Sequence, residues 1–335
     1  MRPGSRQRLH QGTKRLGKRL APGKKCFRIL FLVSVIIVAT GAFAWIHFHS
    51  SQIGAAAAIG STSSKQPKTP EELLALSPAE LEHYDIARMN LLCAEGLPGA
   101  EGLNLDEDLA VLDLWAQHIK SEIDRNVHDY REDPTYFYNS TNFYKMAMMA
   151  RVLYEDYNIR YNPKWITSPG SERPDDHFFA DSSDVFISGL IGDKHWGTCS
   201  SMPVLYVALG RRLGYPLKLV TTKQHLFIRW DSPTEKFDMD ATSKGVDHYD
   251  DSVYRQWPFP ISDEEIKEDG YLKSLSAREE LSIFMSIRGF CQIDNRLLPA
   301  SVESFKAAYQ LEPSWKGNQL LLTRVQQRQN QTRNR

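Results

Sequence analysis

One stretch of the chain contains cysteine, histidine and aspartate side chains of the kinds needed for nucleophilic attack on a carbonyl carbon. Cys199 precedes an apolar segment, so we expect its sulfur at the positive end of a helix dipole, which favours the thiolate. His225, on a predicted strand further along, can accept or share the thiol proton. Asp240 on the following strand can orient the imidazole, and Asp238 is a rival because strand side chains repeat every two residues. The pattern predicts a Cys-His-Asp triad.

Each of these residues also has an explanation that involves no chemistry. A cysteine before a helix is commonly buried, a histidine in a strand is commonly a core residue with satisfied hydrogen bonds, and an aspartate is commonly solvated. Spacing alone does not transfer such triads from one family to another. The triad is therefore a hypothesis that depends on the elements around it.

Hydrophobic periodicity predicts the elements that must position these side chains. Helical spacing indicates helices over 77–95, 108–123, 142–157, 183–192 and 199–214. Strands are indicated over 217–222, 225–231 and 236–242. Helices followed by consecutive strands are typical of an α+β fold in which helices pack on an antiparallel sheet.

The segment from Gly197 to Thr242 resembles the transglutaminase-like superfamily, particularly its SirB1-type bacterial branch. It has the same order of a Gly-x-Cys that opens a helix, an Arg-Leu-Gly-x-Pro exit, a histidine on a strand, and an Asp-x-Thr. The resemblance implies a papain-like fold in which Cys199 is the nucleophile, His225 the base and acid, and Asp240 the group that orients the imidazole.

The same segment departs from the superfamily pattern in two respects. The strand after His225 reads LFIRWD, where many relatives have a Trp-containing HAW pattern. No side chain can be assigned to an oxyanion hole, and His195, Trp196 and Gln224 are only nearby candidates. These departures bear on whether the predicted triad catalyses turnover of a substrate.

Two hypotheses about function therefore stay open. The first is a membrane-anchored thiol enzyme that acts on amide or peptide bonds of a protein or peptide substrate, by hydrolysis or by acyl transfer to an amine. The second is a catalytically inactive transglutaminase-like scaffold that binds a partner at the membrane. No cofactor or metal is expected, because the chain has no Gly-rich phosphate loop or zinc pattern and its acidic residues at 175–184 are irregularly spaced.

The C-terminal part has a second resemblance. A capping box at Ser276 predicts a helix to about Cys291, and a second helix is predicted over 299–311. Gly289, Phe305 and two later residues, Ala308 and Pro313, have tetratricopeptide-repeat spacing. One repeat cannot bury its own apolar face, so these helices should pack on the core or contribute to a groove for a protein partner. The basic tail from Arg324 is expected to fray.

The N-terminal part predicts membrane attachment. Residues 29–46 form an uncharged apolar run long enough to cross a bilayer, and the ten basic residues before it should hold the N-terminus in the cytoplasm. A cleaved signal peptide is the alternative. The remaining chain holds 31 basic and 41 acidic residues, which argues against nucleic-acid binding. The later domain would be extracytoplasmic, or periplasmic in a bacterium.

These observations divide the chain into six parts. They are a basic cytoplasmic arm (1–28), a transmembrane signal-anchor (29–48), a flexible linker (49–69), a transglutaminase-like domain (70–270), tetratricopeptide-like helices (271–320) and a basic tail (321–335). In an oxidising compartment the three later cysteines suggest one disulfide and one free thiol. A Cys93–Cys291 pair would leave Cys199 free, although the sequence does not prove that pairing.

Overall fold

The computed structural model of the chain describes residues 66–166, 177–242 and 247–333. The predicted arm, the predicted anchor and most of the predicted linker lie outside the described residues. Among the described residues, no helix combines the length and the apolar character that a membrane crossing requires. Gln66–Arg335 form one compact unit, which contains every element named below.

The described residues fold as a helix-rich α+β structure with small sheets, which confirms the predicted fold class at this level. The α-helices are α3 (Pro70–Leu74), α4 (Pro78–Glu82), α5 (Ile86–Ala94), α6 (Leu105–Arg125), α7 (Val127–Glu132), α8 (Thr141–Glu155), α9 (Ser182–Val185), α10 (Ser188–Ile191), α11 (Met202–Arg212), α12 (Asp251–Tyr254), α13 (Asp263–Asp269), α14 (Ala277–Asp294), α15 (Leu298–Leu311) and α16 (Lys316–Arg333). The 3-10 helices are η1 (Pro134–Phe137) and η2 (Pro163–Trp165). The strands are β1 (Arg160–Tyr161), β2 (Trp196–Gly197), β3 (Leu217–Thr222), β4 (His225–Asp231) and β5 (Lys236–Met239).

Three of the strands form an antiparallel sheet in the order β3-β4-β5. A two-residue turn joins β3 to β4, and its second residue, Gln224, has φ of 62°. The predicted bounds of β3 and β4 agree with the structure, whereas β5 ends at Met239, three residues earlier than predicted. Asp240 therefore lies just beyond the end of a strand.

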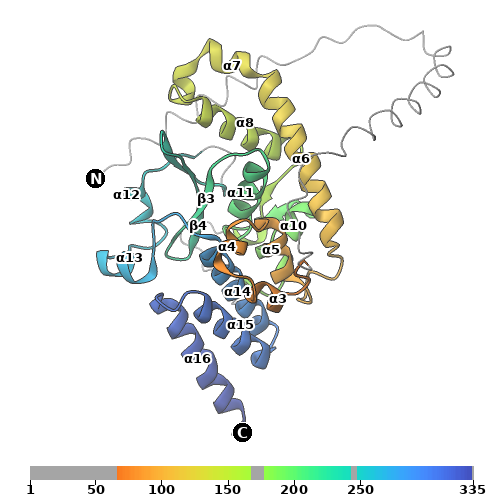
Figure 1. Ribbon diagram of the computed structural model, residues 1–335, viewed down its shortest axis with the longest axis vertical. Helices are drawn as coiled ribbons and strands as arrows, with labels where there is room; N and C mark the ends of the chain where they lie inside the picture. The colour runs from red at the N-terminus through yellow and green to blue at the C-terminus, as the bar shows by residue number, and fades with distance from the viewer. Residues whose placement is uncertain (1–65, 167–176, 243–246, 334–335) are drawn as a thin grey trace, which may run out of the picture. The chain divides into compact units, whose positions relative to one another are not determined.

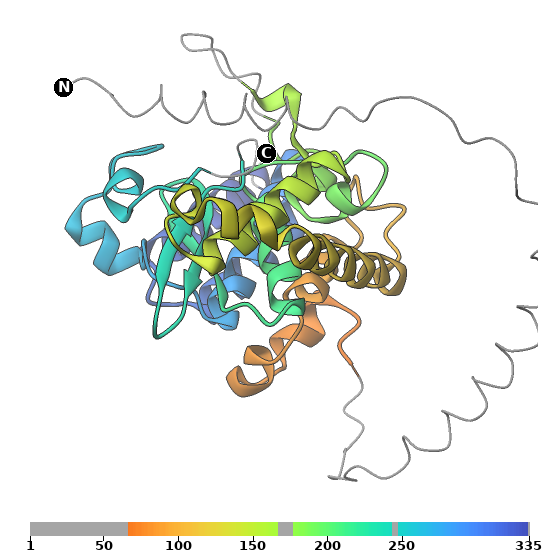
Figure 2. The ribbon, with the colours of Figure 1, turned by 90° about the horizontal axis from the view of Figure 1, so that it is seen from above.

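The two faces of this sheet are packed differently. Leu219, Ile228 and Met239 on one face belong to the main hydrophobic core, which also contains most of α11. Figures 1 and 2 both show α11 between these strands and α6. On the other face Val220 and Phe227 form a smaller apolar cluster with Tyr254, the last residue of α12. The second face is the one that carries His225 and Arg229, because side chains alternate along β4.

Helix α11 approaches β3 closely because of one glycine. A Cβ atom at Gly210 would lie 2.1 Å from Cδ1 of Leu217, far inside van der Waals contact. The chain then reverses at Gly214, whose φ of 74° favours glycine, and enters β3. The Arg-Leu-Gly-x-Pro exit thus corresponds to a tight helix-to-strand connection.

Two helices predicted as continuous are interrupted. The predicted helix over 77–95 is α4 followed by α5, because Asp85 accepts a hydrogen bond from the backbone N–H of Ala87 and starts a new helix. The predicted helix over 183–192 is likewise divided into α9 and α10. In the first case a polar residue at the helix N-terminus divides an apolar pattern that periodicity alone reads as continuous. In the second case α10 begins after Ile187 without a side-chain cap.

The C-terminal helices pack onto the main core. Phe284, Leu281 and Ala308 of α14 and α15 belong to the same hydrophobic cluster as α5 and α11. A Cβ atom at Gly289 would lie 2.8 Å from the ring of Phe305, so this glycine permits the close approach of α14 and α15. The expectation that the tail frays from Arg324 is wrong, because α16 continues to Arg333 and buries Val325 against α15. Figure 1 shows α16 beside α15.

Candidate active site

Cys199 lies in the turn between β2 and α11 and is half-buried. The turn is fixed by two buried hydroxyls, because Oγ1 of Thr198 and Oγ of Ser201 both donate to the backbone carbonyl of Asp184, at 3.0 and 3.1 Å. The backbone N–H of Thr198 also donates to Oγ of Ser201. The sequence predicts a helix that begins near Cys199. The helix begins three residues later, at Met202, so Cys199 lies in the turn before α11.

Gly197 has a steric reason to be glycine. A Cβ atom there would lie 2.6 Å from Oγ of Ser201 and 2.8 Å from Cδ2 of Leu190. The backbone carbonyl of the same residue accepts from Asn162, which continues the parallel pairing of β1 with β2. The Gly-x-Cys spacing therefore corresponds to a close-packed turn that presents the cysteine.

His225 and Asp240 form a buried hydrogen-bonded pair. The distance from Nε2 of His225 to Oδ2 of Asp240 is 2.7 Å, and the two side chains are 4% and 3% exposed. The other oxygen of Asp240 accepts from the backbone N–H of Thr242 at 2.8 Å and from its hydroxyl. The backbone N–H of Asp240 donates to the carbonyl of Asp247. Asp240 is thus held from three directions.

The Cys199 thiol lies next to the same imidazole. Burial alone would lower the pKa of His225, but hydrogen bonds with Asp240 and Cys199 and the charges of both groups raise it to about 9. Burial alone would raise the pKa of Asp240, but its hydrogen bonds from His225 and Thr242 hold it below its ordinary value. At neutral pH the pair is therefore an imidazolium and a carboxylate, with the sulfur beside the imidazolium.

Asp238, the rival for the orienting role, has a different partner. It lies directly opposite Arg229 in the register of β4 and β5 and accepts from Nε and Nη2 of that arginine, at 2.6 and 2.9 Å. Arg229 is 1% exposed and also donates to the carbonyl of Leu272 and to Asp251. The alternative that the sequence left open is thus resolved geometrically, because Asp240 contacts His225 and Asp238 contacts Arg229.

Aromatic residues after β5 cover the imidazole. The ring of Tyr254 stacks on Phe227 with 3.8 Å between centroids, and its backbone carbonyl accepts from the hydroxyl of Thr222. The ring of Trp257 stands at 72° to that of His225, with 4.7 Å between centroids. Neither Arg229 nor Trp257 is among the site residues predicted from the sequence. A charged residue in the middle of an apolar strand is a signal for Arg229, whereas no sequence pattern indicates Trp257.

The three candidates for an oxyanion hole have separate environments. His195 has φ of 53° and stacks against Trp115, and its Nδ1 is buried without a hydrogen-bond partner among the described residues. Trp196 is 40% exposed, and Gln224 lies in the β3–β4 turn. No hydrogen bond within the described ranges joins any of them to Cys199. The backbone N–H of Cys199 donates to no acceptor in the described part of the chain.

The other described cysteines differ from Cys199. Cys93 and Cys291 are buried and unpaired, so the suggested disulfide between them is not formed. The thiol of Cys93 contacts the sulfur of Met285 instead. Burial raises the pKa of Cys93 to about 12 and raises the pKa of Cys291 as well. Neither thiol has the surroundings of a nucleophile.

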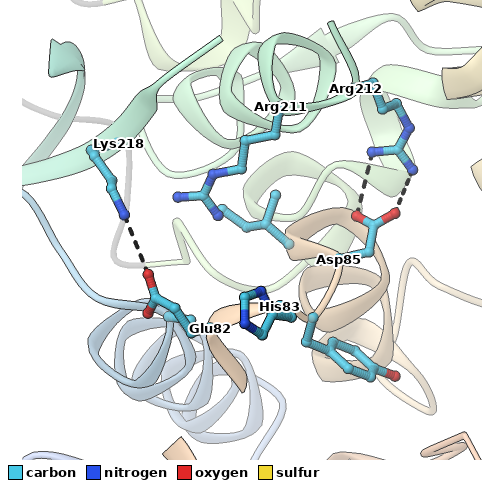
Figure 3. A pocket seen from close by; sticks show the side chains of 9 residues that line it. Glu82, His83, Asp85, Arg211, Arg212 and Lys218 are labelled. Carbon is cyan, nitrogen blue, oxygen red and sulfur yellow. Dashed lines mark hydrogen bonds and ion pairs between the residues drawn. The ribbon is translucent and has the colours of Figure 1, made fainter. Parts of the chain in front are cut away.

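A polar pocket of about 300 Å³ lies at the other end of α11, among Arg211, Arg212 and residues of α4 and α5 (Figure 3). Its charges are paired within the protein. Arg212 donates to both carboxylate oxygens of Asp85, and Lys218 lies 3.5 Å from Glu82. The length of α11 separates this pocket from Cys199, about 16 Å at 1.5 Å per residue. The pocket is therefore not part of the candidate active site.

Among the residues that the structure describes, no group of three or more metal-binding side chains is clustered. Comparisons of the chain with family models, curated proteins and solved structures found no match. The geometry around Cys199, His225 and Asp240 is consequently the main evidence on function.

Proposed function

We propose that the chain is a transglutaminase-like thiol enzyme that acts on amide or peptide bonds through Cys199, His225 and Asp240. The observation that carries the proposal is that one buried imidazole contacts both the thiol and a buried carboxylate. A nucleophile, a proton carrier and an orienting acid in this order are the parts of a thiol acyltransferase or hydrolase.

The first half of the reaction forms a thioester. The attacking form is the Cys199 thiolate paired with the His225 imidazolium, so no proton has to leave the sulfur in this step. The thiolate attacks the carbonyl carbon, a C–S bond forms, and the C=O π electrons move to the oxygen, which becomes an oxyanion. The backbone N–H of Cys199, which donates to no acceptor among the described residues, is the candidate donor to that oxygen. When the tetrahedral intermediate collapses, the C–N bond breaks and the imidazolium of His225 gives its proton to the leaving amine. The enzyme then holds the acyl group as a thioester and His225 is neutral.

The second half releases the acyl group. Neutral His225 takes a proton from water or from an incoming amine, whose oxygen or nitrogen attacks the thioester carbon. The C–S bond breaks, and the sulfur and imidazolium return to their starting state. Asp240 stabilises the imidazolium of the free enzyme before and after each turnover, and it fixes the ring through Nε2, which leaves Nδ1 for proton transfer.

Three further parts of the proposal come from the sequence. The segment from Gly197 to Thr242 resembles the transglutaminase-like superfamily, and this resemblance supports a papain-like arrangement of α11 and the sheet. The apolar run at 29–46 supports a single-pass anchor with the enzyme domain outside the cytoplasm. The helices at 277–311 support a protein substrate or partner, because they are similar to a tetratricopeptide repeat.

The experiment is to trap the acyl-enzyme on the full chain in detergent. A p-nitrophenyl ester is mixed with the wild-type chain and with the Cys199→Ala variant, the mixture is quenched in acid, and the acylated peptide is mapped by mass spectrometry. We expect acyl groups on Cys199 in the wild type and a loss of turnover of about 10⁴-fold or more in the variant. Addition of a primary amine then distinguishes acyl transfer from hydrolysis.

The matched control is the thermal unfolding of the two proteins. Removing one half-buried sulfur should change Tm little, so a loss of turnover can be attributed to the nucleophile. Equal turnover in Cys199→Ala would disprove the proposal, and a wild-type chain that is folded but never acylated would favour the scaffold hypothesis instead.

A further inference from the structure

An exposed apolar patch lies directly beside the candidate active site. We call it the Val253/Trp257 patch, after its two residues, which are 39% and 45% exposed. The backbone N–H of Trp257 donates to the carbonyl of Val253 at 2.9 Å, so the residues are one helical turn apart and share a side. Exposed apolar side chains that adjoin one another mark binding surfaces more often than isolated ones do.

The patch touches the proton carrier. The ring of Trp257 is 4.7 Å from the ring of His225 between centroids, so one part of the indole covers the imidazole while the rest faces solvent. An acyl group bound to Cys199 lies next to His225, because the imidazole must reach both the sulfur and the leaving amine. A side chain near the scissile carbonyl would therefore meet this indole.

The patch is also held in place. Tyr254, between the two patch residues, stacks on Phe227 and accepts a hydrogen bond from Thr222. Asp251, at the start of α12, accepts from the buried Arg229. These three contacts tie α12 to the sheet, so the patch is a preformed surface and little ordering is needed when a ligand binds.

The cations on neighbouring segments are already paired. Lys223 in the β3–β4 turn binds Glu265, and Arg255 binds Asp263. Arg229 is buried between two aspartates. No unpaired lysine or arginine on these segments of the described chain can therefore recognise an acidic side chain. Val253 and Trp257 are the exposed large apolar residues of this segment, beside the exposed polar residues Ser252 and Gln256.

We infer that the Val253/Trp257 patch is the subsite for an aromatic side chain of the acyl donor. This inference rests on the proposed function and specifies its substrate class: an amide or ester whose acyl group carries an aromatic residue beside the reacting carbonyl. Offset or edge-to-face contact with the indole supplies the recognition, and Val253 extends the apolar surface. Trp257 is then a residue that determines specificity.

The test compares acyl donors that differ only in the side chain. The full chain is assayed with the p-nitrophenyl esters of N-acetyl-phenylalanine, N-acetyl-alanine and N-acetyl-lysine. We expect kcat/KM for the phenylalanine ester to exceed that for the alanine ester by about tenfold, which is the range for an added apolar group in a pocket. Trp257→Ala should reduce this ratio to about one, and Trp257→Phe should keep most of it.

The ratio of kcat/KM for the phenylalanine ester to that for the alanine ester shows whether Trp257 recognises the substrate side chain or only positions His225. If Trp257 only orients His225, then Trp257→Ala slows both esters alike and the ratio stays near its wild-type value, which overturns the inference. A wild-type preference for the lysine ester also overturns it. Leu320→Ala is the matched control, because Leu320 is a similarly exposed apolar residue on α16, and we expect it to leave the ratio unchanged.

A binding measurement keeps the inference testable if turnover fails. The Cys199→Ala variant has no nucleophile, and we expect it to bind N-acetyl-phenylalanine amide more tightly than N-acetyl-alanine amide by calorimetry. Adding Trp257→Ala should abolish that difference. A chain that never forms an acyl-enzyme but shows this difference would contradict the proposed function and support the subsite. A chain that is acylated at Cys199 without any side-chain preference would support the proposed function and contradict the subsite.

Discussion

Two buried acid–base pairs share one face of the β3-β4-β5 sheet, and they differ in what the basic partner still has to donate. In the first pair, Arg229 gives its donors to Asp238, to Asp251 and to a backbone carbonyl. In the second pair, His225 uses one ring nitrogen for Asp240 and also hydrogen-bonds Cys199. In the first pair all three nitrogens of the guanidinium already donate to protein acceptors, and the guanidinium stays charged. The second can exchange a proton with a reacting group, which is the difference between holding a fold and performing chemistry.

The largest expected effect on kcat comes from replacing the aspartate of one pair and comparing it with the aspartate of the other pair. Asp240→Asn removes the charge that stabilises the imidazolium, so we expect kcat to fall by about 10³-fold or more. Asp238→Asn is the matched control, since it changes the same residue type two positions earlier, within β5, at a side chain that pairs with Arg229 and not with His225. We expect its kcat to stay within about threefold of wild type, measured on protein shown to be folded. A similar loss in both variants would remove the distinction between the pairs.

The second effect concerns stability. Asp238→Asn leaves the guanidinium of Arg229 buried with one charged partner fewer, and we expect the free energy of unfolding to drop by about 3 kcal/mol. Urea denaturation followed by circular dichroism measures this difference. Replacement of the partly exposed ion-pair partner Glu265 by Gln should change the free energy of unfolding much less, which provides the surface comparison. An Asp238→Asn protein as stable as wild type would show that the Arg229 cluster does not hold the sheet.

The third effect is a pH dependence. His225 has a pKa raised to about 9, so its imidazolium is present at neutral pH and is lost as the pH rises through that value. Amide turnover needs this proton for the leaving amine, and we expect kcat to fall above pH 9. Alkylation of Cys199 by iodoacetamide needs no such proton and should not fall over the same range. Parallel losses of both rates would contradict the assignment of His225 as the acid.

The same titration predicts a change in stability. The folded pKa of His225 lies above its unfolded value, so the stabilisation by Asp240 is complete below about pH 6.5 and is lost as the pH rises through about 9. We expect the difference in unfolding free energy between wild type and His225→Gln to shrink from pH 7 to pH 10. A difference that is constant over this range would mean that the pair is not ionic.

The smallest effect comes from Thr242. Its hydroxyl and backbone N–H donate to the oxygen of Asp240 that His225 does not use. Thr242→Val keeps the shape and the backbone donor but removes the hydroxyl, which costs about 1 kcal/mol. We expect kcat to fall by about fivefold. Thr234→Val is a suitable control, because that exposed hydroxyl lies in the β4–β5 connection and forms a long hydrogen bond, 3.4 Å, with the hydroxyl of Ser232.

Much of the sheet and only part of the site could be predicted from the sequence. The bounds of β3 and β4 follow from their apolar runs and the two-residue turn between them. The choice between Asp238 and Asp240 could not be made, because side-chain alternation puts both on one face. The cross-strand register decides it by placing Arg229 opposite Asp238, and register depends on tertiary contacts.

Other features depend on partners distant in the sequence. The Gln- and Arg-rich composition of α16 predicts fraying, yet a few apolar residues such as Val325 suffice once α15 is present to cover them. The contact of Trp257 with His225 joins positions 32 residues apart and follows no periodic pattern. Such contacts belong to the fold, and local sequence does not specify them.

The proposed chemistry requires that His225 activates Cys199, and alkylation of the native full chain measures this activation. The chain is treated with limiting iodoacetamide at pH 7, and the modified cysteines are mapped in wild type and in His225→Ala. We expect Cys199 to be modified at least about tenfold faster in wild type than in the variant, while buried Cys93 and Cys291 react only after denaturation. Equal rates of Cys199 modification in the two proteins would contradict the activation of this thiol by His225.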